Sequence, residues 1–98
     1  MHEQAVVGFG AIVNCDGEYG EIKRMYVDPS VRGRGVGKRI LQKLEEHAVA
    51  DNLSCIRLET GVRQPEAIAL YRSNGYRVIE AFGAYLPDPL SIFMEKRM

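Results

Sequence analysis

Residues 31–39 combine glycine and basic side chains in a pattern that can hold phosphate. The stretch reads Val-Arg-Gly-Arg-Gly-Val-Gly-Lys-Arg. Glycine lets the backbone come close to a ligand, because no Cβ obstructs its N–H group. Residues 37–50 follow with the pattern of a helix, whose first N–H groups are unpaired and carry the positive end of the helix dipole. Four basic side chains add full positive charge, so the stretch predicts a phosphate site.

The spacing of the glycines distinguishes between three known phosphate-binding motifs. A Walker P-loop requires glycine, four residues and then Gly-Lys-Ser/Thr; here Arg32 stands at the first position and Arg39 at the hydroxyl position. The dinucleotide fingerprint G-x-G-x-x-G requires two residues in its second interval, where Gly35 and Gly37 leave only one. The pattern Arg/Gln-x-x-Gly-x-Gly/Ala matches at all three fixed positions, Arg32, Gly35 and Gly37.

The surroundings of this stretch give the short match a wider context. Residues 21–29 precede it with a strand pattern that ends at a proline, and residues 66–76 carry a second motif, Glu-Ala-Ile-Ala-Leu-Tyr-Arg-Ser-Asn-Gly-Tyr. This ordered pair resembles the GNAT superfamily, the Gcn5-related N-acetyltransferases, over about residues 6–95. The resemblance implies transfer of an acetyl group from acetyl-coenzyme A, as cosubstrate, to an amine of a small molecule or protein.

The resemblance assigns the coenzyme to two neighbouring segments. Backbone N–H groups of the glycine-rich loop would hold the pyrophosphate, and the backbone of the preceding strand would pair with the pantetheine arm. An N–H group of that strand would polarise the thioester carbonyl, an oxyanion-hole effect. Gln64 stands where family members often have a coenzyme-binding asparagine, and its side chain is longer. The implied coenzyme-binding residues are Met25, Tyr26, Val27, Arg32, Gly33, Arg34, Gly35, Val36, Gly37, Lys38 and Gln64.

The resemblance also implies two catalytic residues. Tyr71 matches the tyrosine that protonates the departing thiolate in many members, since that thiolate leaves poorly without a proton. The alternative for Tyr71 is a core tyrosine on an apolar helix face. Glu21 occupies the place where some members carry a glutamate that acts as general base towards the amine. Other members use water chains, and a surface carboxylate near the start of a strand is the alternative interpretation of Glu21.

Length and composition indicate one ordinary domain. The chain has 98 residues, of which 46% are hydrophobic and 27% charged, as in soluble globular domains. Its formal net charge is zero, which gives it no general attraction to nucleic acid or an anionic membrane. No stretch approaches the roughly 18–20 apolar residues of a membrane helix, and the first residues lack a secretory signal. We therefore expect a cytoplasmic protein.

The cysteines give no sign of a metal or disulfide framework. Cys15 and Cys55 are the only two in the sequence, and they have neither C-x-x-C spacing nor paired histidines nearby. Cys55 lies in an apolar run, so it is expected to be a small buried hydrophobic residue. No metal cofactor is expected.

The elements that must position these residues can be predicted from turn signals and periodicity. Residues 5–13 form an apolar, β-rich run, and Asp16-Gly17 is expected to turn the chain into an antiparallel strand at 19–27. The continuous apolarity of the first run suggests that both of its faces are covered. Apolar residues in steps of three and four then predict a helix over 37–50; they are Val36, Ile40, Leu41, Leu44, Ala48 and Val49.

The second half of the sequence completes the predicted fold. Residues 54–60 alternate with period two and form a right-handed βαβ unit with the strand before the loop. Pro65 suits the start of a second, short helix and Gly75 the position just past its end. Residues 76–79 and 90–95 predict two more strands. The fold class is therefore α/β, with a mixed, mostly antiparallel five-stranded sheet and two helices in the order β-β-α-β-α-β-β.

The sequence departs from the family pattern at its start. Members usually begin with a strand and two helices before the hairpin, whereas this sequence starts directly at the hairpin. The run at residues 5–13 is then expected to be an uncovered apolar edge, which invites pairing with another chain. We therefore expect a homodimer.

Three functions compete on these grounds. The leading one is an acetyl-coenzyme A-dependent N-acetyltransferase, whose acceptor amine no motif identifies. The alternative is a coenzyme-binding module that acts as a sensor or assembly element without turnover. A nucleic-acid-binding domain is disfavoured, because the charge is balanced and no aromatic residues interleave with the basic cluster.

Overall fold

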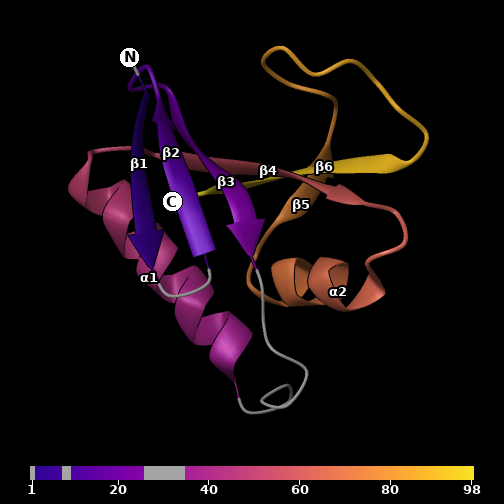
Figure 1. Cartoon of the computed structure of the whole chain (residues 1–98), viewed down its shortest axis with the longest axis horizontal. Coiled ribbons are helices and arrows are strands. Elements are labelled where there is room, and N and C mark those ends of the chain that lie inside the picture. Colours follow the sequence, from indigo (N-terminus) through magenta and orange to yellow (C-terminus); the bar gives the residue numbers. More distant parts are fainter. Residues whose placement is uncertain (1, 8–9, 26–34) are drawn as a thin grey trace.

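The computed structural model describes residues 2–7, 10–25 and 35–98. Within these ranges, six strands form one sheet and two helices pack with it (Figure 1). The elements in chain order are β1 (His2–Val7), β2 (Gly10–Cys15), β3 (Tyr19–Met25), α1 (Val36–Ala50), β4 (Cys55–Gly61), α2 (Pro65–Ser73), β5 (Arg77–Ile79) and β6 (Ser91–Arg97). The strand order across the sheet is β1-β2-β3-β4-β6-β5.

The sheet is mixed, as expected. β3 and β4, which α1 connects in the sequence, are parallel neighbours in the sheet. The pairs β1–β2, β2–β3, β4–β6 and β5–β6 are antiparallel. The predicted fold class, an α/β domain with a mostly antiparallel sheet and two helices, is therefore confirmed.

The predicted number of strands is wrong, because the run at residues 5–13 is not one strand. Residues 2–7 form β1 and pair with β2, with Val7 opposite Gly10. This pairing gives the backbone groups on the β2 side of β1 hydrogen-bond partners within the sheet. The connection, residues 8–9, lies outside the described ranges. Because the run contains no polar turn residues, its composition did not reveal the division.

The turn between β2 and β3 follows the sequence signal. Asp16 and Gly17 have φ angles of 56° and 75°, the left-handed conformation that an Asp-Gly turn supplies. The N–H of Glu18 donates to the carbonyl oxygen of Cys15 at 3.0 Å. The predicted hairpin is confirmed.

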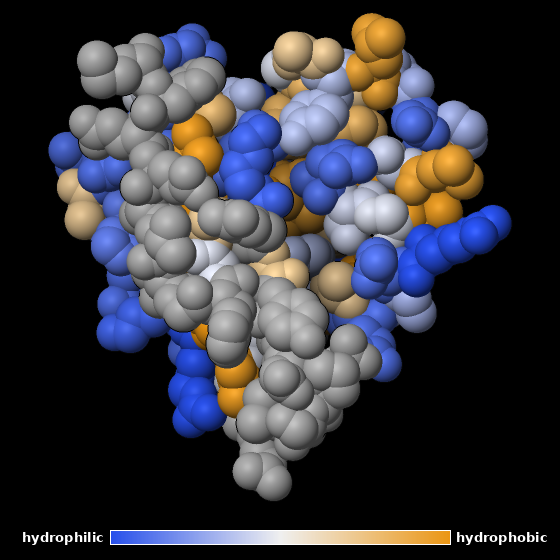
Figure 2. Space-filling view, in the orientation of Figure 1, coloured by the Kyte–Doolittle hydropathy of each residue, from blue (hydrophilic) through white to orange (hydrophobic). Residues whose placement is uncertain are grey.

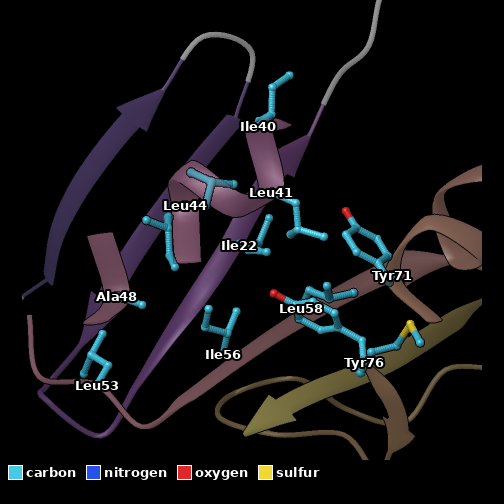
Figure 3. Packing of buried hydrophobic residues seen from close by; sticks show 12 residues of the cluster. Ile22, Ile40, Leu41, Leu44, Ala48, Leu53, Ile56, Leu58, Tyr71 and Tyr76 are labelled. Carbon is cyan, nitrogen blue, oxygen red and sulfur yellow. The ribbon is translucent and has the colours of Figure 1, made fainter. Parts of the chain in front are cut away.

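One hydrophobic core joins both helices to the sheet. The buried residues of α1 are Ile40, Leu41, Leu44 and Ala48, and they contact residues of β2, β3, β4, β6 and α2 in the same cluster (Figure 3). Val49 was expected on this apolar stripe but is 56% exposed. Successive residues of an α-helix are about 100° apart around its axis, so Val49, one residue after the buried Ala48, lies off the buried face.

The remaining elements agree with their signals. α2 begins at Pro65, and Gly75, just beyond its C-cap Asn74, has a φ of 93°. Cys15 and Cys55 are buried free thiols.

The described ranges contain no helix that combines the length and apolarity needed to cross a bilayer. In the same ranges, histidine, cysteine and acidic side chains do not gather in threes that could hold a metal ion.

Candidate active site

β3 and β4 pair with each other over a short stretch only. Residues 20–22 of β3 lie opposite residues 56–58 of β4, and the described pairing ends there. β3 continues to Met25 and β4 to Gly61, and Figure 1 shows their arrows pointing in different directions beyond the paired part. The edge of β3 at residues 23–25 therefore presents backbone groups that an extended ligand can pair with.

A bulge accompanies this divergence. Ala11 of β2 lies opposite Arg24, whereas the next residue, Ile12, lies opposite Ile22. Lys23 is therefore the extra residue on β3. An extra residue bends a strand and increases its twist, which turns the end of β3 away from β4.

The N-terminus of α1 is open to an anion. Gly35 precedes the helix with a φ of 73°, a conformation that costs little only for glycine. The first described helical hydrogen bond runs from the N–H of Arg39 to the carbonyl oxygen of Gly35 at 3.1 Å. The N–H groups of residues 36–38 consequently have no carbonyl partner within the helix. The first turn carries no acidic residue, so its positive dipole end is not neutralised from within.

The structure places part of the predicted coenzyme site and leaves part of it outside the described ranges. Residues 35–38 together form the start of α1, and Met25 ends β3. Gln64 is exposed directly before α2, where its N–H donates to the carbonyl oxygen of Gly61 at 3.1 Å. The predicted residues that lie outside the described ranges are Tyr26, Val27, Arg32, Gly33 and Arg34.

Tyr71 lies in the core, with 5% of its surface exposed. Its ring packs against that of Tyr76, with 5.6 Å between the centroids, and Figure 3 shows it directed from α2 towards the side of Leu41. Burial raises the pKa of Tyr71 to about 12. The phenol therefore keeps its proton near neutral pH.

Glu21 is a buried carboxylate rather than a surface one. Its neighbours in β3, Gly20 and Ile22, face the core with α1, because a Cβ on Gly20 would meet the side chains of Ile12 and Leu53. Strand alternation then turns Glu21 to the opposite face, where it is 5% exposed. The surface interpretation of this residue is wrong, because the segment before β6 covers it.

Two donors hold the same oxygen of Glu21. The Tyr85 hydroxyl donates to Oε2 at 2.6 Å, and the Lys23 ammonium donates to it at 3.1 Å. Burial and the hydrogen bond to Glu21 raise the pKa of Tyr85. Burial alone would lower the pKa of Lys23, but the hydrogen bonds to Glu21 and Tyr85 and the charge of Glu21 together outweigh it, so that the pKa is raised. The two donors therefore stay protonated and hold the carboxylate in place.

A pocket of about 640 Å³ lies at this face of the sheet. Glu21, Lys23 and Arg57 line it together with the aromatic residues Tyr19 and Tyr85. Sequence reasoning did not identify Lys23, Arg57 or Tyr85. The alternation of residues 54–60 could have placed Arg57 on one face, but nothing local connects Tyr85 to Glu21.

Arg57 is held firmly at the wall of this pocket. Its Nε donates to Oε2 of Glu95 at 2.9 Å, and its guanidinium lies 4.6 Å from the ring centroid of Tyr19. Glu95 is 4% exposed and also faces Arg77 at 3.6 Å and Arg97 at 3.4 Å. Burial would raise the pKa of Glu95, but the hydrogen bonds from Arg57 and Cys55 and the charges of Arg57 and Arg97 together outweigh it, so that the pKa is lowered.

Comparison with known proteins identifies the family. The model of the acetyltransferase (GNAT) family matches residues 1–76. The chain belongs to the GNAT acetyltransferase family. It is 53% identical over 92 residues to the IAA acetyltransferase of Azospirillum brasilense, covering 93% of this chain and 60% of that protein. To the uncharacterised N-acetyltransferase YsnE of Bacillus subtilis it is 37% identical over 95 residues, covering 95% and 63%.

Solved structures of GNAT acetyltransferases share the fold. A protein of Klebsiella pneumoniae assigned to the acyl-CoA N-acyltransferases is 50% identical with a TM-score of 0.87, covering 90% of this chain and 61% of that one. The PaiA N-acetyltransferase of Thermoplasma acidophilum, in complex with coenzyme A, is 22% identical with a TM-score of 0.73, covering 92% and 54%. The family resemblance predicted from the motifs is confirmed. The chain spans about 60% of the length of the Azospirillum, Bacillus and Klebsiella proteins named above.

Proposed function

We propose that the chain is an N-acetyltransferase domain, which transfers an acetyl group from acetyl-coenzyme A to an amine of a small molecule or protein. The observation that carries this proposal is the succession of two ligand-binding features in one segment. In the sequence, the edge of β3 at residues 23–25, beyond its pairing with β4, precedes the open N-terminus of α1 at residues 35–38. Membership of the GNAT family supports the same reaction class.

Backbone groups bind the coenzyme in this proposal. The N–H groups of residues 36–38 hold the pyrophosphate at the helix N-terminus, and Arg32, Gly33, Arg34 and Gly35 belong to the same loop. The backbone of Met25, Tyr26 and Val27 pairs with the extended pantetheine arm, and Gln64 contributes its amide. When bound, the coenzyme supplies the acetyl group as an activated thioester.

Two side chains move the protons. Glu21 accepts the proton that the amine loses, directly or through water, as the nitrogen–carbon bond forms. Tyr71 donates its proton to the sulfur as the carbon–sulfur bond breaks. The buried position of each group favours this role, because its partners hold it in one orientation. The tyrosine and the glutamate return to their starting states by exchange with solvent.

One contact favours the alternative function, a coenzyme-binding module with little or no turnover. The Lys23 ammonium already occupies Oε2 of Glu21 at 3.1 Å, which is the atom an acceptor amine would approach. Turnover requires Lys23 to move aside. The Lys23 side chain is 46% exposed, so its ammonium can move from Glu21 into solvent.

We also infer a cytoplasmic homodimer that acts without nucleic acid, membrane or metal. The formal net charge of zero supports the absence of a polyanionic partner. Free thiols at Cys15 and Cys55 suit a reducing compartment. The position of β1 at an edge of the sheet supports association of two chains.

Calorimetric titration with acetyl-coenzyme A tests the proposal. We expect a dissociation constant on the order of 1–100 μM, within the usual range of enzyme–substrate affinities. Gly35→Ala should weaken binding by about tenfold, since a Cβ at a φ of 73° costs roughly 1–2 kcal/mol and displaces the first turn of α1. Absence of binding at millimolar acetyl-coenzyme A would contradict the proposal.

Gly17→Ala is the matched control for this variant. Gly17 has a φ of 75°, and a Cβ there meets nothing within 4 Å, as at Gly35. It lies in the turn between β2 and β3, away from α1. We expect it to lower stability by a similar amount and to leave the affinity for acetyl-coenzyme A unchanged.

A further inference from the structure

Glu21 and Arg57 lie side by side on the face of the sheet that is turned away from α1. They are register partners on the parallel strands β3 and β4, about 5 Å apart between neighbouring strands. Although their charges are opposite, each has its closest ion-pair contact elsewhere. Glu21 contacts Lys23, and Arg57 contacts Glu95. Both residues line the same pocket, so the pocket presents one site for a cation and one for an anion.

The Glu21 side of the pocket is already shaped for an ammonium group. The Lys23 ammonium lies 3.1 Å from Oε2 of Glu21, 3.5 Å from the Tyr85 hydroxyl and 5.7 Å from the centroid of the Tyr85 ring. A carboxylate, a phenol oxygen and an aromatic face together form a good environment for an ammonium. A ligand amine that displaces Lys23 finds the same partners.

The Arg57 side carries donors that suit a carboxylate. A guanidinium has five N–H donors in a fixed fork, and the hydrogen bond to Glu95 uses the one on Nε. The four donors on the two Nη atoms suit the paired oxygens of a carboxylate. Glu95 carries one negative charge but faces three arginines, Arg57, Arg77 and Arg97. Among these four residues, positive charge therefore exceeds negative charge.

We propose that the acceptor is an α-amino acid, whose carboxylate binds Arg57 while its amine lies at Glu21. This assignment rests on the proposed acetyltransferase function and names its substrate class. An α-amino acid carries both groups on one carbon atom, which matches two register partners on neighbouring strands.

The rest of the pocket narrows the class further. The rings of Tyr19 and Tyr85 line it, and the Tyr19 ring contacts that of Phe82 at 5.5 Å. Aromatic walls favour an apolar or aromatic amino-acid side chain. Asp16 and Glu18 line the exposed rim, and their charge disfavours a second carboxylate on the ligand. The favoured acceptor is therefore a neutral, apolar amino acid.

Acetyl transfer to a matched pair of acceptors tests the assignment. L-Phenylalanine and phenethylamine differ only in the carboxylate. We expect kcat/KM for phenylalanine to be at least about tenfold higher, since a charge-assisted hydrogen-bond pair contributes roughly that factor or more. Arg57→Gln should raise KM for phenylalanine by about 10–100-fold and leave phenethylamine within about threefold. Equal use of both acceptors by the unaltered chain would overturn the assignment.

Two further variants separate recognition from structure. Arg77→Gln removes another cation that faces Glu95 but lies outside the pocket lining, and it should leave both acceptors unchanged. Arg57→Lys keeps a cation near Glu95 and loses the fork that pairs with two oxygens. It should lose most of the preference for phenylalanine even if Arg57→Gln does not fold. Retention of the full preference in Arg57→Lys would count against carboxylate recognition by Arg57.

A binding measurement judges the assignment without catalysis. Calorimetry compares N-acetyl-L-phenylalanine with N-acetylphenethylamine on the unaltered chain, and we expect tighter binding of the carboxylated compound by about tenfold or more. Equal affinity, or no binding of either compound, overturns the assignment. If acetyl-coenzyme A binds and phenethylamine is acetylated as well as phenylalanine, the proposed function stands and this inference fails. If acetyl-coenzyme A does not bind, the proposed function itself fails.

Discussion

The environment of Tyr71 shows its core position and is compatible with the proposed catalytic role, the two alternatives that the sequence left open. The ring is a core residue, 5% exposed and packed against Tyr76. The same burial raises the pKa of Tyr71 to about 12, so the phenol is protonated near neutral pH. A structural role and a catalytic role are therefore compatible at this position, and only kinetics separates them.

At the residue scale, Tyr71→Phe should lower kcat by about 10²-fold, the smaller end of the range for general acid catalysis. The affinity for acetyl-coenzyme A should stay within about twofold, because the proposed coenzyme contacts are made by other residues. The measurement is thiol release from acetyl-coenzyme A together with calorimetric binding. An unchanged kcat would assign Tyr71 to the core alone.

Tyr76→Phe is the control for this variant. Tyr76 is equally buried, and its hydroxyl donates to Glu45 at 3.0 Å. Loss of that hydrogen bond should cost about 1–2 kcal/mol of stability. Because Tyr76 has no proposed role in proton transfer, kcat should not change.

At the scale of elements, a buried carboxylate joins three strands. Glu95 of β6 contacts Arg57 of β4 and Arg77 of β5, and it also faces Arg97 of its own strand. β5 has only three residues and pairs with β6 alone among the described strands. The charge cluster therefore contributes to holding the short edge strand in register.

The lowered pKa of Glu95 gives this cluster a defined pH dependence. A carboxyl group whose pKa in the folded state lies below its usual value of 4.5 contributes stability above that value, and the contribution is lost as the pH falls through the folded pKa. Glu95→Gln should lower the free energy of unfolding by about 3 kcal/mol at pH 7, as expected when one partner of a buried ion pair is removed. The difference from the unaltered chain should shrink towards acid pH in urea denaturation. A difference that stays constant with pH would contradict this account.

Glu46→Gln is the matched control on α1. Glu46 pairs with Lys43 at 3.6 Å, and both side chains are about two-thirds exposed, 67% and 64%. Solvent-exposed pairs of this kind contribute only about 0.3–0.5 kcal/mol. The substitution should therefore have little effect at any pH.

At the scale of the whole molecule, both sheet edges and one loop invite association. β1 and β5 are the outer strands of the described sheet. In the loop between β5 and β6, Leu86 is 81% exposed and Leu90 is 62% exposed, and Figure 2 shows hydrophobic residues at the surface on this side of the molecule. Unpaired edges and exposed apolar side chains are typical of surfaces that pair with another chain.

We expect sedimentation to give a species of twice the chain mass of 11.0 kDa. The dimer should be maintained at about 0.15 M salt, where surface charges are largely screened, because edge pairing and apolar contact do not depend on them. A folded monomer that persists at high protein concentration would exclude the dimer.

Local signals in the sequence predicted most elements of the fold. Asp16-Gly17 indicated the turn between β2 and β3, and the spacing of apolar residues indicated α1. The motif from Arg32 to Gly37, together with the second motif at residues 66–76, indicated the family. These features depend on neighbours along the chain, so the sequence contains them directly. The division of residues 5–13 into two strands was missed, because pairing partners rather than composition determined it.

Only the tertiary structure determined which residues line the pocket and which donors contact the carboxylate of Glu21. The hydrogen bond from Tyr85 to Glu21 joins residues 64 positions apart, and the one from Arg57 to Glu95 joins residues 38 positions apart. Such contacts follow from the order of strands in the sheet and from the path of the segment before β6. The amino-acid sequence thus determined the family and indicated the proposed coenzyme-binding segment, because both depend on local patterns. Folding decided which charges meet across the sheet, because long-range packing brings together residues that no local pattern connects.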